Sequence, residues 1–392
     1  MKRDGQCVSL WQHNMAAYVS DNQLLNTENI DVVIVGGGIT GLTTALLLQK
    51  AGKRCLIAEA NNLGFGTTGG TTCHLNTIMD TPYYQLIENF GENNAQQVAR
   101  LARNAIELIE RNIQEYDIQC DYEKKPAYLF SQDSKQTEEL GKIVEGTKRV
   151  QVDIDYVSSL PAPIPYKKLV KIPGQAQMHA TKYLYGIARA FEKMGGQILQ
   201  NCRVTNVIQE GGDTWVETTV GKIKTGSVVY ATHIPPGVNI LHFRCAPYRS
   251  YVLAVLLKDD NYPDAMVYDL CDPYHYYRTQ VVDGVKYLIA GGEDHKTAHE
   301  ENTETCFEKL EHYVRRHYDV DRVAFRWSSQ YFEPADGLPY IGQLPGNPAN
   351  VFVATGFGGN GIIYGTVSGL VLSDLICNGA SVHKELFNPA RV

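Results

Sequence analysis

Residues 31–60 contain the pattern that decides the fold, and they read "DVVIVGGGITGLTTALLLQKAGKRCLIAEA". A short run of β-branched apolar residues comes first, and the closely spaced glycines Gly36, Gly38 and Gly41 follow it directly. Apolar residues then recur at helical spacing, and a second apolar run ends at Glu59. This order of strand, glycine turn, helix and strand predicts the β-α-β unit of a Rossmann-like α/β fold.

The spacing of these glycines also predicts a dinucleotide-binding turn. The first glycine permits a tight bend, the second lets the backbone approach a pyrophosphate, and the third lets helix and strand pack closely. Glu59 follows Gly38 at the distance of about 20 residues where a carboxylate would hold ribose hydroxyls and repel the 2′-phosphate of NADP. A purely structural glycine turn is the alternative, and the pattern alone leaves open whether FAD or NAD binds.

A second glycine-rich segment near the end of the sequence favours FAD. Residues 356–377, "GFGGNGIIYGTVSGLVLSDLIC", place a glycine loop after a strand-like run and at the start of a helix. The positive N-terminus of this helix suits the edge of an isoalloxazine ring, where negative charge collects when the flavin is reduced. A nicotinamide has little use for such a site, so an NAD-linked dehydrogenase is kept as the alternative from another enzyme class.

Composition argues against several other classes of protein. The 392 residues carry a net charge of −7 without a basic block, so we expect no nucleic-acid binding. The nine cysteines are scattered without the spacing of a metal site, so we expect free thiols, no metal and a cytoplasmic location. The longest apolar run, residues 251–257, is too short to span a membrane, and the N-terminal residues do not resemble a secretory signal.

Several segments together resemble the FAD-dependent amino-acid-oxidase superfamily, which includes D-amino acid oxidase, glycine oxidase and sarcosine oxidase. From about Asp31 onward they occur in the expected order as "VVIVGGGITGLTTALLLQKAG", Glu59, "GFGTTGGTTCHLN", "VVYAT", "ADGLPYIG" and "GFGGNGI". The segments "MKRDGQCVSLWQ", "GTTGGTT" and "AGGEDHKTA" more closely resemble a bacterial branch that usually carries a C-terminal Rieske iron–sulfur domain. The resemblance implies hydride transfer from a C–H bond beside an amine nitrogen to flavin N5, giving an imine that hydrolyses.

The resemblance further implies a glutathione-reductase-like flavoprotein architecture. An FAD-binding domain would be assembled from several segments, and an α+β substrate domain would cover the flavin with a mostly antiparallel sheet. The expected ranges are 30–120, 170–245 and 320–392 for the FAD-binding domain, and 121–169 and 246–319 for the substrate domain. Residues 1–29 would form an N-terminal extension, and Trp11 and Tyr18 suggest that it packs against the body of the protein.

By motif position, the resemblance assigns FAD contacts along much of the chain. The first glycine turn would meet the pyrophosphate, Glu59 the ribose and Val204 the adenine. The loop 67–72 would pass beside the ring system, and the second glycine loop would close on its pyrimidine edge. The predicted cofactor residues are Gly36, Gly38, Ile39, Gly41, Glu59, Ala60, Thr67, Thr68, Gly70, Thr71, Thr72, Val204, Ala231, Thr232, Gly358, Gly359, Asn360, Gly361 and Ile362.

Two departures from the family pattern concern the redox centres. A Rieske domain needs one pair of ligands as Cys-x-His and another as Cys-x-x-His, and the sequence contains neither pair. We therefore expect either a fragment or a branch without the cluster, with an electron-acceptor protein or an iron–sulfur domain as partner. Ser329 stands where enzymes of the sarcosine oxidase type attach FAD to a cysteine, so we expect noncovalent FAD.

A third departure concerns the substrate. Tyr331 stands where the D-amino acid dehydrogenase and glycine oxidase branches carry an arginine that pairs with the substrate carboxylate. Arg278 is one cation that could replace it, although a salt bridge at a surface or a domain interface is an equal alternative. The aromatic residues around Arg278 suit an apolar or cationic substrate.

Two histidines complete the predicted catalytic residues. His295 follows a strand-like run in "GGEDHKT" and could act as a base oriented by Glu293 or Asp294, unless this loop is simply solvated. His74 is expected on the flavin side of its loop. A base is not strictly required, because many amine-oxidising flavoenzymes take a neutral amine.

The sequence therefore predicts an FAD-dependent oxidoreductase that oxidises a C–N bond of an amine or amino acid and passes the electrons to an acceptor. Because the carboxylate-binding arginine is absent, a secondary amine, a polyamine derivative or an unusual amino acid is expected in preference to a simple α-amino acid. A non-enzymatic flavoprotein scaffold or assembly factor is the alternative outside the enzyme classes.

Overall fold

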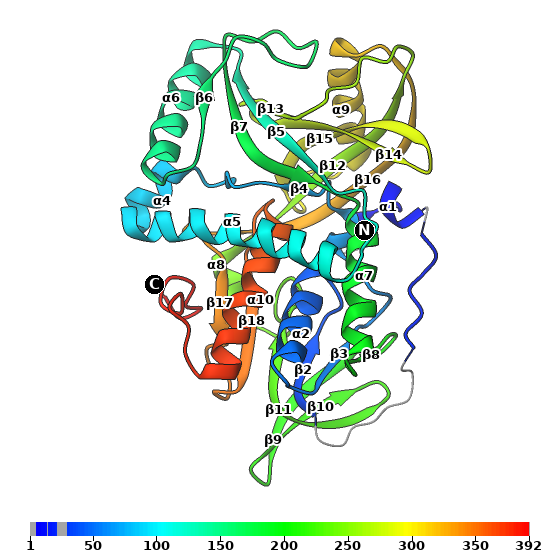
Figure 1. Cartoon of the computed structure of the whole chain (residues 1–392), viewed down its shortest axis with the longest axis vertical. Coiled ribbons are helices and arrows are strands. Elements are labelled where there is room, and N and C mark those ends of the chain that lie inside the picture. Colours follow the sequence, from blue (N-terminus) through cyan, green and yellow to red (C-terminus); the bar gives the residue numbers. More distant parts are fainter. Residues whose placement is uncertain (1–4, 14, 22–29, 392) are drawn as a thin grey trace.

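Two large sheets dominate the computed structural model, which describes residues 5–13, 15–21 and 30–391. In the view of Figure 1 the eight-stranded sheet occupies the lower half and the ten-stranded sheet the upper half, and helices pack against both. The predicted combination of an α/β layer with a second, mostly antiparallel sheet is confirmed.

The eight-stranded sheet is the Rossmann-like layer. Its strands are β2 (Ile30–Val35), β3 (Cys55–Ala58), β8 (Gln197–Leu199), β9 (Val204–Glu210), β10 (Asp213–Thr218), β11 (Gly221–Tyr230), β17 (Tyr340–Gln343) and β18 (Val351–Thr355). The order is β17-β18-β11-β2-β3-β8, with only β17 antiparallel to its neighbour, and the hairpin β9-β10 extends from β11. Consecutive residues of β2 point to opposite faces, and Val33 and Ile34 lie in two different apolar clusters. Both faces of this strand are therefore buried.

Glycines let two helices beside this sheet approach each other closely. The helices around the layer are α2 (Ile39–Lys50), α5 (Glu92–Glu115), α7 (Ala180–Lys193) and α10 (Gly361–Asn378). A Cβ atom added at Gly365 of α10 would lie 2.9 Å from Oγ1 of Thr40 in α2. A Cβ atom at Gly369 would lie 2.7 Å from the side chain of Thr43. Small residues therefore fix how α2 and α10 lie against each other.

Helix α10 is also the one described helix that is long and apolar enough to cross a membrane by length and composition. Most of it is buried inside the protein, where it packs against α2 and α5. Its apolar sequence therefore serves the core of this structure.

The ten-stranded sheet covers the other side of the molecule. Its strands are β1 (Gly5–Gln6), β4 (His74–Leu75), β5 (Glu123–Ser131), β6 (Asp155–Tyr156), β7 (Lys168–Gln177), β12 (Cys245–Leu257), β13 (Met266–Tyr268), β14 (His275–Val282), β15 (Val285–Lys296) and β16 (Val320–Pro334). The order is β1-β16-β12-β15-β14-β13-β5-β7-β4, with β6 beside β7, and only the β5-β13 pair is parallel. The remaining helices are α1 (Leu10–His13), α3 (Thr67–Gly70), α4 (Tyr83–Phe90), α6 (Ser134–Arg149), α8 (Leu241–Arg244) and α9 (Thr303–His317).

The sheet pairings differ from the expected domain ranges in three places. Residues 74–75, 170–177 and 320–334 were expected in the FAD-binding domain, but β4 pairs with β7, β7 with β5 and β16 with β12, all in the second sheet. An alternating apolar pattern shows that a segment is a strand, but it does not show which of two sheets the strand joins. Long-range pairing decides this, and it places these segments in the ten-stranded sheet.

The described part of the N-terminal extension packs against the body, as Trp11 and Tyr18 predicted. Trp11 is fully buried, and its Nε1 donates a hydrogen bond to the carbonyl oxygen of Thr71 at 2.6 Å. The hydroxyl of Tyr18 donates to Oε2 of Glu192 at 2.5 Å. Residues 1–4, 14 and 22–29 of the extension lie outside the described residues.

Candidate active site

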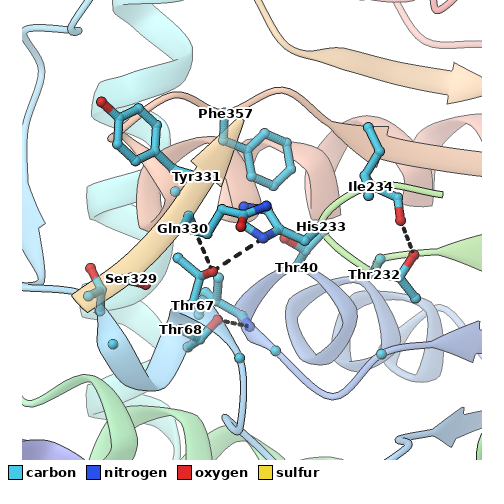
Figure 2. A pocket seen from close by; sticks show the side chains of 18 of the residues that line it. Thr40, Thr67, Thr68, Thr232, His233, Ile234, Ser329, Gln330, Tyr331 and Phe357 are labelled. Atoms are coloured by element: carbon cyan, nitrogen blue, oxygen red, sulfur yellow. Dashed lines mark hydrogen bonds between the residues drawn. The ribbon is translucent and has the colours of Figure 1, made fainter. Parts of the chain in front are cut away.

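A cavity of about 950 Å³ lies between the two sheets. It is lined by the turn after β2, the loop 64–72, the end of β11, the middle of β16 and the N-terminus of α10 (Figure 2). Cavities of this size bind cofactors and drug-sized ligands. Segments that are far apart in the sequence thus meet around one space.

The glycine turn is built as its spacing predicts. Gly36 has a φ of +114°, and a Cβ atom there would lie 2.5 Å from the carbonyl oxygen of Ala231. A Cβ atom at Gly41 would lie 2.0 Å from the carbonyl oxygen of Gly36, so the start of α2 packs directly on the turn. Gly38 lines the cavity at the N-cap of α2 and exposes backbone there. Positive helix N-termini of this kind bind phosphate groups.

Glu59 is held rigidly at the same end of the cavity. Its Oε2 accepts a hydrogen bond from the backbone N–H of Gly37 at 2.7 Å, and its Oε1 accepts one from Asn61 at 2.8 Å. A carboxylate has further lone pairs for hydroxyl donors. The residues at this end, which we call the dinucleotide end, therefore fit the pyrophosphate and ribose of FAD.

The loop 64–72 is tied to its surroundings by hydrogen bonds. Oγ1 of Thr67 donates to the carbonyl oxygen of Gln330 at 2.9 Å and lies 3.2 Å from Nδ1 of His233. Oγ1 of Thr68 accepts from the backbone N–H of Ile39 at 3.1 Å (Figure 2). The loop is thus fixed to β16 on one side and to α2 on the other.

The N-terminus of α10 reaches the cavity beside a carboxylate that sequence reasoning missed. The backbone N–H of Gly359 donates to Oδ2 of Asp80 at 2.7 Å, and the N–H of Asp80 donates to Oδ1 of Asn360 at 2.8 Å. Asp80 lines the cavity and is exposed to the solvent in it, although many protein atoms surround its carboxyl group. Burial raises the pKa of Asp80, against contacts with Gly359 and Asn360 that favour the charged form.

All predicted cofactor residues except Gly41 line the cavity. Gly41 lies behind the turn, where it supports the contact between α2 and Gly36. The second glycine loop, residues 358–362, lines the cavity at the N-terminus of α10 as expected. The positions fit FAD, and the individual contacts with the cofactor stay predictions.

The other end of the cavity is lined by tyrosines, and we call it the tyrosine end. Tyr331 lies there as predicted, with its hydroxyl donating to Oδ2 of Asp294 at 2.8 Å and its ring stacked on Tyr248 at 5.8 Å. Burial and the charge of Asp294 raise the pKa of Tyr331 far above its usual range, so the phenol stays protonated. The other tyrosines of this end are Tyr268, Tyr274 and Tyr276.

Asp294 was predicted only as an orienting partner, but it is the carboxylate that reaches the cavity from β15. Burial raises the pKa of Asp294 to about 7, although hydroxyls of Ser250 and Tyr331 favour the charged form. Its Oδ1 makes no hydrogen bond of good geometry with the described residues. The Ser250 hydroxyl instead bonds to that of Tyr276 at 3.1 Å.

His74 lines the cavity, as predicted, next to the tyrosine end. Its Nδ1 lies 2.6 Å from the hydroxyl of Tyr268, and its Nε2 is buried without a hydrogen-bond partner among the described residues. Burial and the nearby charge of Arg278 lower the pKa of His74 well below its usual value. His74 is therefore neutral at pH 7.

The structure corrects the predicted position of Arg278. Its side chain is fully buried but does not line the cavity. Nη2 donates to the carbonyl oxygen of Met178 at 3.1 Å, and the guanidinium lies 5.1 Å from the ring centre of Trp11. The aromatic partner of Arg278 thus comes from the N-terminal extension, and the guanidinium does not face the cavity, where it was expected to replace the missing arginine.

His295 is also corrected, because it lies on the opposite face of β15 from Asp294. Its Nε2 lies 2.8 Å from the hydroxyl of Tyr251, and its Nδ1 lies 2.8 Å from the carbonyl oxygen of Lys296. Neighbouring residues of a strand point to opposite faces. An irregularity in the β12-β15 register, where Glu293 has a φ of +56°, sets which face each side chain takes.

One further group of potential metal ligands lies away from the cavity. Atoms of Asp269, Cys271 and His275 lie within 4.8 Å of one another. Both oxygens of Asp269 already accept hydrogen bonds, Oδ1 from the N–H groups of Cys271 and His275, and Oδ2 from His275 Nδ1 and the Tyr313 hydroxyl. The geometry suits a hydrogen-bonded network that fixes the β13-β14 connection, and the expected absence of a metal site stays a prediction.

Comparison with known proteins gives concordant results. The family model described as FAD dependent oxidoreductase matches residues 31–375. The chain is 30% identical to a Bacillus subtilis (strain 168) protein, YhfW, whose name calls it a Rieske 2Fe-2S iron–sulfur protein, over 92% of this chain and 71% of that one. It is 23% identical to gamma-glutamylputrescine oxidoreductase of Escherichia coli (strain K12), over 92% and 86% of the two chains.

Among solved structures, glycine oxidase from Geobacillus kaustophilus has the same fold. The TM-score is 0.78 at 18% sequence identity, and the match covers 92% of this chain and 98% of that one. L-Proline dehydrogenase from P. horikoshii matches with a TM-score of 0.74 at 19% identity, over 93% and 98% of the chains. At these identities the likeness concerns the fold alone.

Proposed function

Because the chain belongs to the family of FAD-dependent oxidoreductases, we propose that it oxidises a C–N bond of an amine or amino acid and passes the electrons to an acceptor. The observation that carries the proposal is the continuity of one cavity from Glu59 to Tyr331. Its dinucleotide end fits FAD, and its tyrosine end extends under the second sheet. Relatives named gamma-glutamylputrescine oxidoreductase and sarcosine oxidase subunit beta support an amine or amino acid as substrate.

In this proposal the chain positions FAD mainly through backbone groups. The turn at Gly36–Gly38 and the N-terminus of α2 would hold the pyrophosphate, Glu59 the ribose, and the N-terminus of α10 the pyrimidine edge. When bound, FAD supplies the acceptor for a hydride equivalent from the carbon beside the nitrogen. Ser329 lines the cavity where relatives carry a cysteine, which supports noncovalent binding.

The residues of the tyrosine end would hold the substrate and keep water away from the reacting carbon. Tyr331 and His74 are the predicted residues that face this space, and the second sheet covers it. Both side chains are uncharged at neutral pH, because burial disfavours their charged forms. Neither is suited to form an ion pair with a substrate carboxylate.

The proposal also includes an electron-acceptor protein or iron–sulfur domain as partner and a cytoplasmic location. The relative named as a Rieske iron–sulfur protein supports an iron–sulfur partner as electron acceptor. All nine cysteines are free, as is usual for proteins of a reducing cytoplasm.

The test is anaerobic mixing of the FAD-loaded protein with a panel of secondary amines, polyamine derivatives and amino acids. Loss of the flavin absorbance near ~450 nm with at least one compound is the expected result. Photoreduction of the same sample confirms that the flavin can be reduced. A photoreducible flavin that no compound bleaches would favour the scaffold alternative over an oxidoreductase.

A further inference from the structure

Two carboxyl groups and no lysine or arginine line the tyrosine end among the described residues. Asp80 and Asp294 both line the cavity there, and both interact electrostatically with Tyr274 and Tyr331. Arg203 is the only arginine or lysine among the described residues that line the cavity. It lies at the dinucleotide end, because the neighbouring Cys202 donates its backbone N–H to the carbonyl oxygen of Glu59.

The uncharged groups of the tyrosine end also suit a cation. The rings of Tyr274 and Tyr276 lie 5.7 Å apart, and His74 contacts the ring of Tyr276 at 5.5 Å. Faces of aromatic rings attract ammonium groups, most strongly where water is excluded. His74 adds no positive charge, because it is neutral.

Asp294 has the geometry of a ligand-binding group. Tyr331 fixes Oδ2 from β16, while Oδ1 is left without a hydrogen bond among the described residues. Burial disfavours the charged form of this carboxyl group, and the positive charge of a bound ammonium group would offset that cost. A bound carboxylate would instead meet like charge from both Asp80 and Asp294.

We infer that the tyrosine end binds the ammonium group of a cationic amine that carries no carboxylate beside the reacting carbon, with Asp294 as its anionic partner. Tyr331 positions Asp294, and the surrounding tyrosines enclose the cation. The inference rests on the proposed function for the identity of the site, and it names the class of substrate that the site takes.

The test uses three ligands of similar length that cannot be oxidised at a C–N bond. Two have a quaternary nitrogen without a lone pair, and the third has no nitrogen. These are butyltrimethylammonium, 4-(trimethylammonio)butanoate and butanoate, with charges of +1, 0 and −1. Binding to the FAD-loaded protein is followed by the change in the flavin spectrum and by calorimetry. We expect the cation to bind at least about tenfold more tightly than the anion, with the zwitterion between them.

Two matched variants identify the group responsible. Asp294→Asn keeps the shape of the side chain and should weaken cation binding by about tenfold or more, without weakening binding of butanoate. Asp264→Asn makes the same change at a solvent-exposed aspartate that pairs with Lys125, and should leave all three affinities unchanged. Unaltered FAD content and thermal unfolding show that each variant is folded.

The outcomes separate this inference from the proposed function. Equal or tighter binding of butanoate overturns the inference, and so does an unchanged cation affinity in Asp294→Asn. If carboxylate-bearing amino acids alone bleach the flavin and the cation does not bind, C–N oxidation stands and the inference fails. If the cation binds through Asp294 but no amine bleaches the flavin, the binding site stands and the proposed function fails.

Discussion

The two ends of the cavity are made from different parts of the polypeptide. The dinucleotide end presents mostly backbone, at the turn of Gly36–Gly38, with one carboxylate from Glu59. The tyrosine end presents side chains from β13, β14, β15, β16 and the turn before β14, and four of them are phenols. A surface of backbone depends on the absence of side chains, whereas a surface of side chains can change its chemistry one residue at a time. We therefore expect substitutions at the first end to abolish binding and substitutions at the second to redirect it.

The largest effect is expected for Gly41→Ala at the dinucleotide end. The added Cβ atom would lie 2.0 Å from the carbonyl oxygen of Gly36, so α2 must move off the turn. Such overpacking costs about 3 kcal/mol or more and should weaken FAD binding by about 100-fold. The amount of FAD that copurifies and a titration of the apoprotein measure this. Gly141→Ala is the control, because the added Cβ atom would meet no atom of the described residues within 4 Å beyond its chain neighbours and its own helix backbone. Equal FAD loss in both variants would contradict the clash.

The next effect concerns the N-terminal extension, which packs against the loop 64–72 beside the cavity. Trp11→Ala should lower the free energy of unfolding by about 3–5 kcal/mol, because it empties a fully buried site. It also leaves the carbonyl oxygen of Thr71 without its donor and Arg278 without its ring. Chemical denaturation gives the stability, and stopped-flow dilution gives the FAD release rate. Trp11→Phe, which keeps an aromatic ring but loses the indole N–H, should recover most of the stability. A wild-type FAD release rate in Trp11→Ala would show that this segment does not support the cavity.

A smaller change should redirect the tyrosine end without affecting the other end. Tyr331→Arg places a cation where the family resemblance leads us to expect a carboxylate-binding arginine, and we expect about tenfold tighter binding of butanoate with unchanged FAD content. Tyr331→Phe removes only the hydroxyl and should not increase butanoate affinity. Spectral titrations of both FAD-loaded variants provide the comparison. Should the arginine variant bind butanoate no better than the phenylalanine variant, Tyr331 does not face the ligand.

The smallest effect is a difference in the pH dependence of stability. The folded protein holds a proton on Asp294 up to about pH 7, whereas the unfolded chain releases it near pH 4, so stability should fall as pH rises between these values. Asp80 and Glu333, whose pKa values are also raised by burial, act in the same direction. Between pH 5 and pH 7.5 the melting temperature should fall less in Asp294→Asn than in the wild type, by roughly a few degrees. Identical slopes would mean that Asp294 is not desolvated.

The same contrast explains how much of the molecule could be predicted from its sequence. Gly36, Gly38 and Glu59 belong to one β-α-β unit, where local spacing determines geometry. The turn has the predicted form, and the contacts of these residues with FAD stay predictions. Asp80 contacts Gly359 from far away in the sequence, and no local pattern connects the two.

At the tyrosine end the face taken by each side chain depends on pairing between strands. His295 was expected to face the cavity, but Asp294 faces it instead, at an irregularity of the register near Glu293. The alternation in "YHYYR" could have placed Tyr274 and Tyr276 on one face, but it could not show that this face meets the cavity.

The N-terminal segment also imposes an order on the assembly of the site. Ser9 and Gln12 donate hydrogen bonds to the carbonyl oxygens of Gly69 and Gly64, so this segment holds the loop beside the cavity. Strand β1 before them pairs with β16, with Gly5 opposite Ser329. A ribosome has made the glycine turn and Glu59 long before it reaches residue 329. The nascent chain can therefore form the dinucleotide end early. The ten-stranded sheet, whose strand β16 holds the N-terminal segment through β1, is completed only after β16 has emerged.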